Sequence, residues 1–303
     1  MNDSLRPTSA RFDTTALITQ LVVYPIKSCA GVAVNEALLI DTGLEFDRAW
    51  MVVDERGDFL TQRELPRLAL VQPQLKHYEM VLRAPGMLAL HVKLDEVEAP
   101  VRVRVWDDEV AAFDMGKIAA QWFSDFLGTT CRLVRFDPGH QRLSSRKWTG
   151  DIDAPNQFSD GFPVLLISEA SLEQLNNKLI DANRSSSKAV SMLRFRPNIV
   201  LGNAPGFEPI SAHDEDRLEM LHITTAEGAA QLKPVTPCQR CPIPNIDPLT
   251  ALSSPEVGDM LQSYRQDPRV AGAITFGMNL VRVGADDCVL RVGQTVQGNF
   301  RFD

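Results

Sequence analysis

Two cysteines three positions apart are the first residues of this chain that could carry out chemistry. Cys238 and Cys241 lie in the stretch PVTPCQRCPIPNIDP, which runs from Pro234 to Pro248. A structural zinc site needs four ligands, and neither a second CxxC nor an HxxxH follows at usable spacing, so zinc is weakly supported. A thioredoxin-like pair places its first cysteine at the start of a helix, and Pro242 and Pro244 oppose a regular helix there. A third interpretation is a pair of small apolar thiols in a tight loop.

The composition limits the class of protein around this pair. Of the 303 residues, 44% are hydrophobic and 23% are charged, as in an ordinary soluble globular protein. The net charge of -8 and the absence of a run of Lys and Arg argue against nucleic acid and anionic membranes as partners. Five cysteines, an odd number, argue against a disulfide framework. The chain shows neither a secretory signal nor a stretch of about 18 apolar residues, so we predict a cytoplasmic protein with no membrane partner.

The residues that precede position 114 predict short strands. LITQLVVYP is typical of a strand that ends at Pro25, and AWMVVDERGDFLT is typical of a hairpin with its turn near Arg56 and Gly57. In VRVRVW the alternation places the three valines on one face, as in a half-buried strand. We therefore expect a mostly β first lobe over residues 17–113.

A helix is predicted next, in the stretch MGKIAAQWFSDFLG, where Gly128 can supply the left-handed stop. Five large apolar residues recur there at helical spacing: Ile118, Trp122, Phe123, Phe126 and Leu127. After the strand candidate CRLVRF, residues 137–161 are rich in Pro, Gly, Ser, Asn and Asp. Such a connection is a disordered linker or a loop over a site, and the composition slightly favours the linker.

The second half of the chain is predicted to be mostly β with a helix or two. FPVLLIS is a buried-strand candidate, and Ser168 can cap the following helix, whose inner stripe is Leu172, Leu175 and Leu179. Further strand candidates are PNIVLGN, LEMLHIT, NLVRVG and VLRVGQTV. The fold class predicted for the whole chain is therefore mainly β with a few helices (α+β).

Several long motifs, in the right order, resemble one known family. PVTPCQRCPIPNIDP is similar to the cysteine loop of MOSC-domain proteins, in the branch that contains the mitochondrial amidoxime-reducing component and bacterial YcbX. YPIKSCAGVAVNEA and GLEFDRAWMVVDERGDFLTQRELPRLALV resemble the N-terminal domain of that family, and SDGFPVLLISEASLEQLN, FRPNIV and ITFGMNLV resemble pieces of the MOSC domain. The resemblance covers about residues 17–298. It implies an N-terminal MOSC β-barrel-like domain over residues 17–135 and a C-terminal MOSC β-barrel domain over residues 136–303.

The resemblance also implies a molybdenum cofactor (Mo-molybdopterin), with the thiolate of Cys241 as the catalytic metal ligand and Cys238 as a neighbour without a metal bond. A soft, deprotonated sulfur suits such a metal. The cofactor-binding residues that the matching motifs imply, besides Cys241, are Lys27, Ser28, Arg48, Arg196, Asn198 and Arg240. This chain departs from the family pattern at Gly161 and Phe162, before the SEAS helix, and at Asn279.

The implied activity is the reduction of small N-hydroxylated compounds, such as amidoximes and hydroxylamines. No cysteine follows Cys288 to ligate an appended iron-sulfur cluster, so we expect a separate ferredoxin-like or flavin reductase electron donor. Asp247 is a candidate general acid, although an Asp-Pro turn is its ordinary role. Two alternatives stay open: a molybdopterin or sulfur carrier with a persulfide on Cys241, and an interaction protein that keeps the fold without the cofactor.

Overall fold

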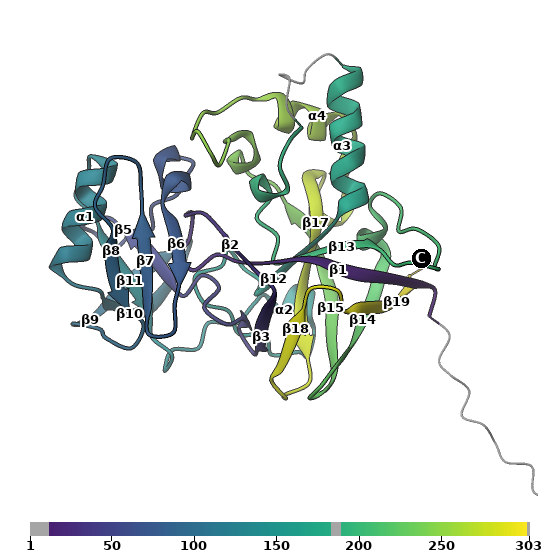
Figure 1. The fold of residues 1–303 in the computed structure, drawn as a ribbon, viewed down its shortest axis with the longest axis horizontal. Helices are drawn as coiled ribbons and strands as arrows, with labels where there is room; N and C mark the ends of the chain where they lie inside the picture. Colours follow the sequence, from purple (N-terminus) through teal and green to yellow (C-terminus); the bar gives the residue numbers. More distant parts are fainter. Residues whose placement is uncertain (1–11, 183–188, 302–303) are drawn as a thin grey trace, which may run out of the picture.

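The structure is a computed structural model that describes residues 12–182 and 189–301. It is mainly β, as predicted, and has two lobes (Figure 1). Among the described residues no helix is both long enough and apolar enough to cross a bilayer. The predicted lack of a secretory signal concerns mainly residues 1–11, which lie outside the described residues.

The small lobe contains two antiparallel sheets, in the orders β5-β11-β10-β9 and β6-β7-β8. Its elements are β5 (Trp50–Val53), η1 (Pro66–Leu70), β6 (Gln72–Leu75), β7 (Glu79–Arg83), β8 (Leu90–Lys93), β9 (Pro100–Val105), β10 (Asp108–Asp114), α1 (Lys117–Leu127) and β11 (Arg132–Phe136). The predicted alternation in VRVRVW is confirmed, because Val103 and Val105 of β9 are buried.

The helix α1 packs one face into the core of the small lobe. Trp122, Phe123 and Phe126 are buried there, and Gly128 ends the helix with a left-handed φ of 72°, as predicted. The prediction was wrong for Ile118, which is 78% exposed. The centre of the buried stripe lies near Ala119, and each helical residue advances by about 100°, so Ile118 falls at the edge of the stripe.

The barrel lobe contains a closed sheet. Within the described residues, seven strands follow the order β12-β13-β1-β19-β14-β15-β17, and β17 pairs back to β12. Its strands are β1 (Thr14–Val23), β2 (Val32–Val34), β3 (Glu36–Ile40), β4 (Gly43–Leu44), β12 (Val164–Ser168), β13 (Ile199–Asn203), β14 (Leu218–Thr225), β15 (Gly228–Gln239), β16 (Gln266–Asp267), β17 (Ala273–Val283), β18 (Cys288–Arg291) and β19 (Thr295–Phe300). Its helices and 3-10 turns are α2 (Arg146–Thr149), α3 (Glu169–Asp181), η2 (Met192–Arg194), η3 (Asp214–Arg217), η4 (Ile243–Asn245), α4 (Glu256–Tyr264) and η5 (Pro268–Val270).

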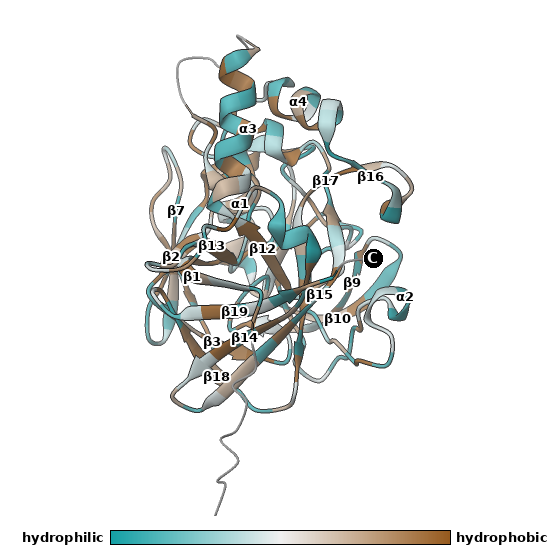
Figure 2. Ribbon diagram, turned by 90° about the vertical axis from the view of Figure 1, so that its right-hand side faces the viewer, coloured by the Kyte–Doolittle hydropathy of each residue, from teal (hydrophilic) through white to brown (hydrophobic). Residues whose placement is uncertain are grey.

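The first strands of the chain belong to the barrel lobe rather than to the small lobe (Figure 1). β1 lies between β13 and β19, and β3 pairs with β18, so residues 14–44 share a core with residues from the second half of the chain. In Figure 2 the strand β12 is mostly hydrophobic, whereas the helix α3 carries both hydrophilic and hydrophobic residues. The domain ranges 17–135 and 136–303 remain a prediction, because a lobe in space need not coincide with a family domain.

β15 contains the start of the cysteine stretch, as far as Gln239, and was not among the predicted strands. Pro234 and Pro237 lie inside it, and proline cannot donate to a strand ladder. The structure accommodates both prolines at irregularities in the pairing with β17, where the register shifts. VLRVGQTV, predicted as one strand, forms parts of β18 and β19, because Val292, Gly293 and Gln294 turn the chain between them.

The predicted cap and stripe of α3 are largely confirmed. Ser168 Oγ accepts a hydrogen bond from Ser171 N at 3.1 Å, and Leu175 and Leu179 are buried, whereas Leu172 is half-buried. The helix α4 packs beside α3, as Figure 1 shows.

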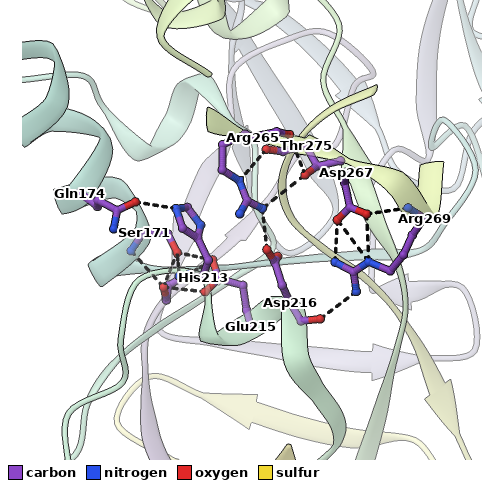
Figure 3. Close-up of polar contacts among 10 residues, drawn as sticks. Ser171, Gln174, His213, Glu215, Asp216, Arg265, Asp267, Arg269 and Thr275 are labelled. Carbon is purple, nitrogen blue, oxygen red and sulfur yellow. Dashed lines mark hydrogen bonds and ion pairs between the residues drawn. The ribbon is translucent and has the colours of Figure 1, made fainter. Parts of the chain in front are cut away.

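A buried polar network ties α3 and α4 to the barrel (Figure 3). Arg265, which follows α4, donates to Asp216 Oδ2 at 2.6 Å and to the Thr275 carbonyl of β17 at 3.1 Å. Glu215 is fully buried and accepts from Ser171 Oγ of α3 at 2.6 Å. The Arg265 bonds fix the end of α4 against β17 and η3, and the Glu215 bond fixes the start of α3 against η3.

Residues 137–161 form a packed loop, so the slight preference for a disordered linker was wrong. Arg142 is 7% exposed and donates to Asp108 Oδ2 of the small lobe at 2.7 Å and to the Ser159 carbonyl at 2.7 Å. The composition could not show this, because one buried guanidinium organises a segment that is otherwise made of turn-forming residues. The loop ends at the candidate site.

Candidate functional site

The cysteine stretch leaves β15 at the junction of the two lobes. Cys238 and Cys241 are free thiols, and both are partly exposed. Arg240 Nη1 donates to Cys238 Sγ at 3.1 Å, whereas Cys241 Sγ has no hydrogen-bond partner among the described residues. No group of three or more potential metal ligands of the His, Cys, Asp and Glu types occurs within residues 12–182 and 189–301. A zinc site built only from side chains therefore has no support there.

A cleft brings together the seven residues that the family resemblance implies as metal-binding or cofactor-binding. Lys27, Ser28, Arg48, Arg196, Asn198, Arg240 and Cys241 all line it. Its described lining includes five cationic side chains but a single carboxylate, that of Asp160. The chain has a net charge of -8, so this concentration of positive charge is local and suits an anionic ligand.

Three of these residues have an uncommon backbone conformation. Ser28, Arg48 and Arg196 have φ values of 67°, 53° and 59°, in the left-handed region that side chains with a Cβ rarely adopt. Each such residue costs of order 1 kcal/mol or more, and such residues cluster at functional sites. The conformation sets the direction in which each side chain enters the cleft.

Arg48 and Asn198 use much of their hydrogen-bonding capacity inside the protein. Arg48 Nη1 forms an ion pair with Asp47 and donates to Asn198 Oδ1 at 3.1 Å, and its Nη2 donates to the Arg196 carbonyl at 3.1 Å. Asn198 also accepts from Leu165 N at 3.1 Å and is 1% exposed. These two side chains fix the backbone that presents Arg196, and their role as cofactor contacts stays a prediction.

Arg196 has unused donors. Its Nη1 donates to the Cys29 carbonyl at 2.6 Å, but its buried Nη2 has no partner among the described residues. The guanidinium lies 4.3 Å from the centre of the Tyr24 ring, and Arg48 lies 4.5 Å from the same ring. Burial, with the repulsion of Arg48, lowers the pKa of Arg196 to about 10. An anion beside this pair of cations would offset both effects.

Lys27 is buried and partly neutralised. Its Nζ donates to Asp160 Oδ1 at 2.6 Å and to the Phe158 carbonyl at 2.8 Å, both from the packed loop. Burial lowers the pKa of Lys27, and the attraction of Asp160 opposes this shift. An ammonium group has three donors, so one remains for a ligand.

The cleft residues that were not singled out from the sequence include Thr61, Arg63 and Asp160. Arg63 stacks on Trp106 at 4.6 Å from the ring centre, and Thr61 Oγ1 accepts from Arg63 N at 3.1 Å. For Thr61 and Arg63 the sequence signal was the polar stretch TQRE, which begins at the end of the predicted hairpin. Asp160 gave no signal, because its role depends on a loop that only folding brings to Lys27.

The remaining candidates have different outcomes. Gly161, Phe162 and Asn279, at which the chain departs from the family pattern, all line the cleft. Asp247 is not among the described residues that line it; it accepts from Leu249 N at 2.8 Å and pairs with Arg194 at 3.0 Å. Burial would raise the pKa of Asp247, but these partners hold it below its usual value. Asp247 therefore serves as an ionised turn residue.

The residues of the cleft fit a molybdenum cofactor in type. Two buried guanidinium nitrogens, Arg196 Nη2 and Arg240 Nε, have no partner among the described residues. Leaving such a donor unsatisfied costs about 1–3 kcal/mol, which an anionic group would recover. The thiol of Cys241 lines the same cleft, and its sulfur is of the soft type that such a metal prefers.

Comparisons with known proteins assign this chain to a family. The model of the MOSC N-terminal beta barrel domain matches residues 15–130, and that of the MOSC domain matches residues 153–297. Mitochondrial amidoxime-reducing component 1 of Mus musculus is 35% identical over 84% of this chain and 73% of that protein. Mitochondrial amidoxime reducing component 2 of Rattus norvegicus is 35% identical over 92% of this chain and 82% of that protein. Molybdenum cofactor sulfurase of Homo sapiens is 30% identical over 92% of this chain but only 32% of that protein. The chain therefore belongs to the MOSC-domain family, in the group that includes the mitochondrial amidoxime-reducing components.

Proposed function

We propose that this chain is a molybdenum-cofactor-dependent reductase of small N-hydroxylated compounds, such as amidoximes and hydroxylamines. The observation that carries the proposal is the partly exposed thiol of Cys241 in a cleft lined by five cationic side chains. The names of the relatives support the same class of chemistry. The reaction breaks an N–O bond, consumes two electrons and two protons and releases water. A separate ferredoxin-like or flavin reductase supplies the electrons, and we place the protein in the cytoplasm.

The residues divide into ligands and supports. Cys241 would hold the metal through its thiolate, while Lys27, Ser28, Arg196 and Arg240 would bind the anionic end of the cofactor. When bound, the cofactor supplies the two-electron redox chemistry that side chains lack. Arg48, through its bond to the Arg196 carbonyl, keeps the backbone of Arg196 in its left-handed conformation.

The test compares Cys241→Ala with Cys238→Ala, both purified from a host that makes the cofactor. We expect Cys241→Ala to lose reductase activity and one sulfur neighbour of molybdenum, measured by X-ray absorption, because it removes the ligand. Cys238→Ala removes the acceptor of an Arg240 bond and a weak donor to the Gln239 carbonyl, so it should keep its metal content and most of its activity. Unchanged molybdenum content and sulfur coordination in Cys241→Ala would remove the assignment of the ligand.

A carrier of sulfur or molybdopterin is the second candidate. The partial exposure of Cys241 favours it, since a persulfide needs an accessible thiol. Mass spectrometry separates the two candidates: a persulfide on Cys241 in a protein without molybdenum supports the carrier. Stoichiometric molybdenum together with turnover of an amidoxime supports the reductase.

A further inference from the structure

Cys241 and Arg240 border two cavities rather than one. The first is the cationic cleft, and the second lies beside α4 and has a volume of about 170 Å³. We call the second one the α4 cavity. Apart from Cys241 and Arg240, its lining residues are Pro242, Pro244, Asn245, Gly258, Leu261 and Ile274.

The wall of the α4 cavity is apolar and preformed. Leu261 of α4 is 1% exposed, and Ile274 comes from β17. Pro242 and Pro244 fix their own φ angles, so the loop that closes the cavity has little freedom to lose when a ligand binds. Arg265 holds the end of α4 against β17. A cavity of about 150 Å³ with apolar walls binds benzene, so the α4 cavity has room for one aromatic ring.

One neutral polar group faces this apolar wall. Asn245 Oδ1 accepts from Gly258 N at 2.8 Å, and a backbone N–H can only donate, so this contact identifies the oxygen of the amide. Asn245 Nδ2 has no hydrogen-bond partner among the described residues and remains a donor for a ligand. A Cβ on Gly258 would lie 3.1 Å from the Asn245 amide, which shows how closely the glycine lets that side chain approach.

A larger cavity lies elsewhere on the chain and fits the reaction less well. It has a volume of about 300 Å³ and is lined by Tyr24, Leu193 and Leu249 among others. It shares Arg196 with the cationic cleft, but Cys241 is not among its lining residues. Of the two, the α4 cavity alone borders the thiol.

We infer that the α4 cavity receives the uncharged apolar body of the substrate, up to about the size of a phenyl ring, and that Asn245 donates a hydrogen bond to an acceptor atom of the N-hydroxylated group attached to that body. This inference rests on the proposed reductase function. It follows that the apolar body lies beside Cys241 in the α4 cavity, while the N-hydroxylated group points toward the cationic cleft that the same thiol borders. The preferred substrates are then N-hydroxylated molecules whose apolar group is no larger than about a phenyl ring.

The test uses benzamidoxime, which carries the reacting group on a phenyl ring, and acetamidoxime, which carries it on a methyl group. Ile274→Phe fills the α4 cavity. We expect it to weaken benzamidoxime binding and to raise the KM for benzamidoxime by about tenfold or more, while the KM for acetamidoxime changes less than about threefold. Binding to the cofactor-free protein is measured by ligand-observed NMR. Leu249→Phe, in the larger cavity, is the matched control, and it should leave the binding and the KM of both compounds unchanged.

Two further variants test the same inference independently, in case Ile274→Phe does not fold. Ile274→Ala enlarges the cavity and should favour amidoximes with groups bulkier than phenyl. Asn245→Asp keeps the acceptor for Gly258 N but removes the donor, so it should weaken the binding of both amidoximes with little change in thermal stability. Equal effects of Ile274→Phe on both compounds, or benzamidoxime binding that responds to Leu249 instead of Ile274, would overturn the inference. A molybdenum-loaded wild type that reduces neither compound would overturn the proposed function, and the NMR measurement would still decide the cavity.

Discussion

Arg48→Lys tests whether a guanidinium fork holds the cleft together. The side chain of Arg48 is 14% exposed and that of Asp47 is 2% exposed. Arg48 joins residues from the two halves of the sequence, because it pairs with Asp47 and donates to Asn198 and to the Arg196 carbonyl. Burial raises the pKa of Asp47, and Arg48 pulls it back down, so this carboxylate depends on the cation beside it.

The expected loss follows from the bonds that lysine cannot make. An ammonium group keeps the charge beside Asp47, but it is compact and cannot reach Asn198 and the Arg196 carbonyl together. Each hydrogen bond from a charged donor contributes about 1.5–3 kcal/mol. Asn198 Oδ1 keeps its second donor, Leu165 N, so we take the lower value, about 1.5 kcal/mol, for each of the two bonds that lysine loses. Arg48→Lys should therefore reduce the free energy of unfolding by about 3 kcal/mol.

The assay is equilibrium unfolding in urea, with Arg104→Lys as the matched control. Arg104 also makes two bonds to a carboxylate, at 2.6 and 2.8 Å from Asp58, but the two side chains are 57% and 40% exposed. An exposed pair contributes about 0–1 kcal/mol, so the control should lose less than that. If the two variants lost the same stability, burial and fork geometry would not be what makes Arg48 important.

Two further predictions concern stability. Burial, assisted by Arg265 and Lys178, lowers the pKa of His213 from 6.5 to about 3. Between these values the unfolded chain binds a proton that the folded chain does not, so the free energy of unfolding falls as pH falls, by up to about 1.4 kcal/mol per pH unit. His213→Asn, which tolerates the left-handed φ of 68°, should show a shallower slope in urea unfolding between pH 6 and pH 4, and an equal slope would contradict the assignment. Ala271 is exposed with a left-handed φ of 57°, so Ala271→Gly should raise the free energy of unfolding by about 1 kcal/mol; a lower melting temperature would refute this.

Local patterns predicted most of the regular elements. The cap at Ser168, the stop at Gly128 and the buried leucines of α3 depend on neighbours within one or two helical turns, so their sequence signals were sufficient. β15 was missed because Pro234 and Pro237 are ordinarily strand breakers, and only the pairing with β17 shows that they sit at irregular positions. Ile118 was misplaced because spacing defines the width of a stripe but not its centre.

The sequence alone determined the mainly β class, the family resemblance, and the thiol and four of the five cationic residues that line one cleft. Those conclusions rest on residue types and on contiguous motifs, which do not require a knowledge of packing. Only the tertiary structure decided which of the cations still have free donors, that Asp160 pairs with Lys27, and that Cys241 borders a second, largely apolar cavity. The physical reason is that charge pairing, burial and cavity shape depend on distances between segments that lie far apart in the sequence. Lys27 and Asp160, for example, are separated by 133 positions.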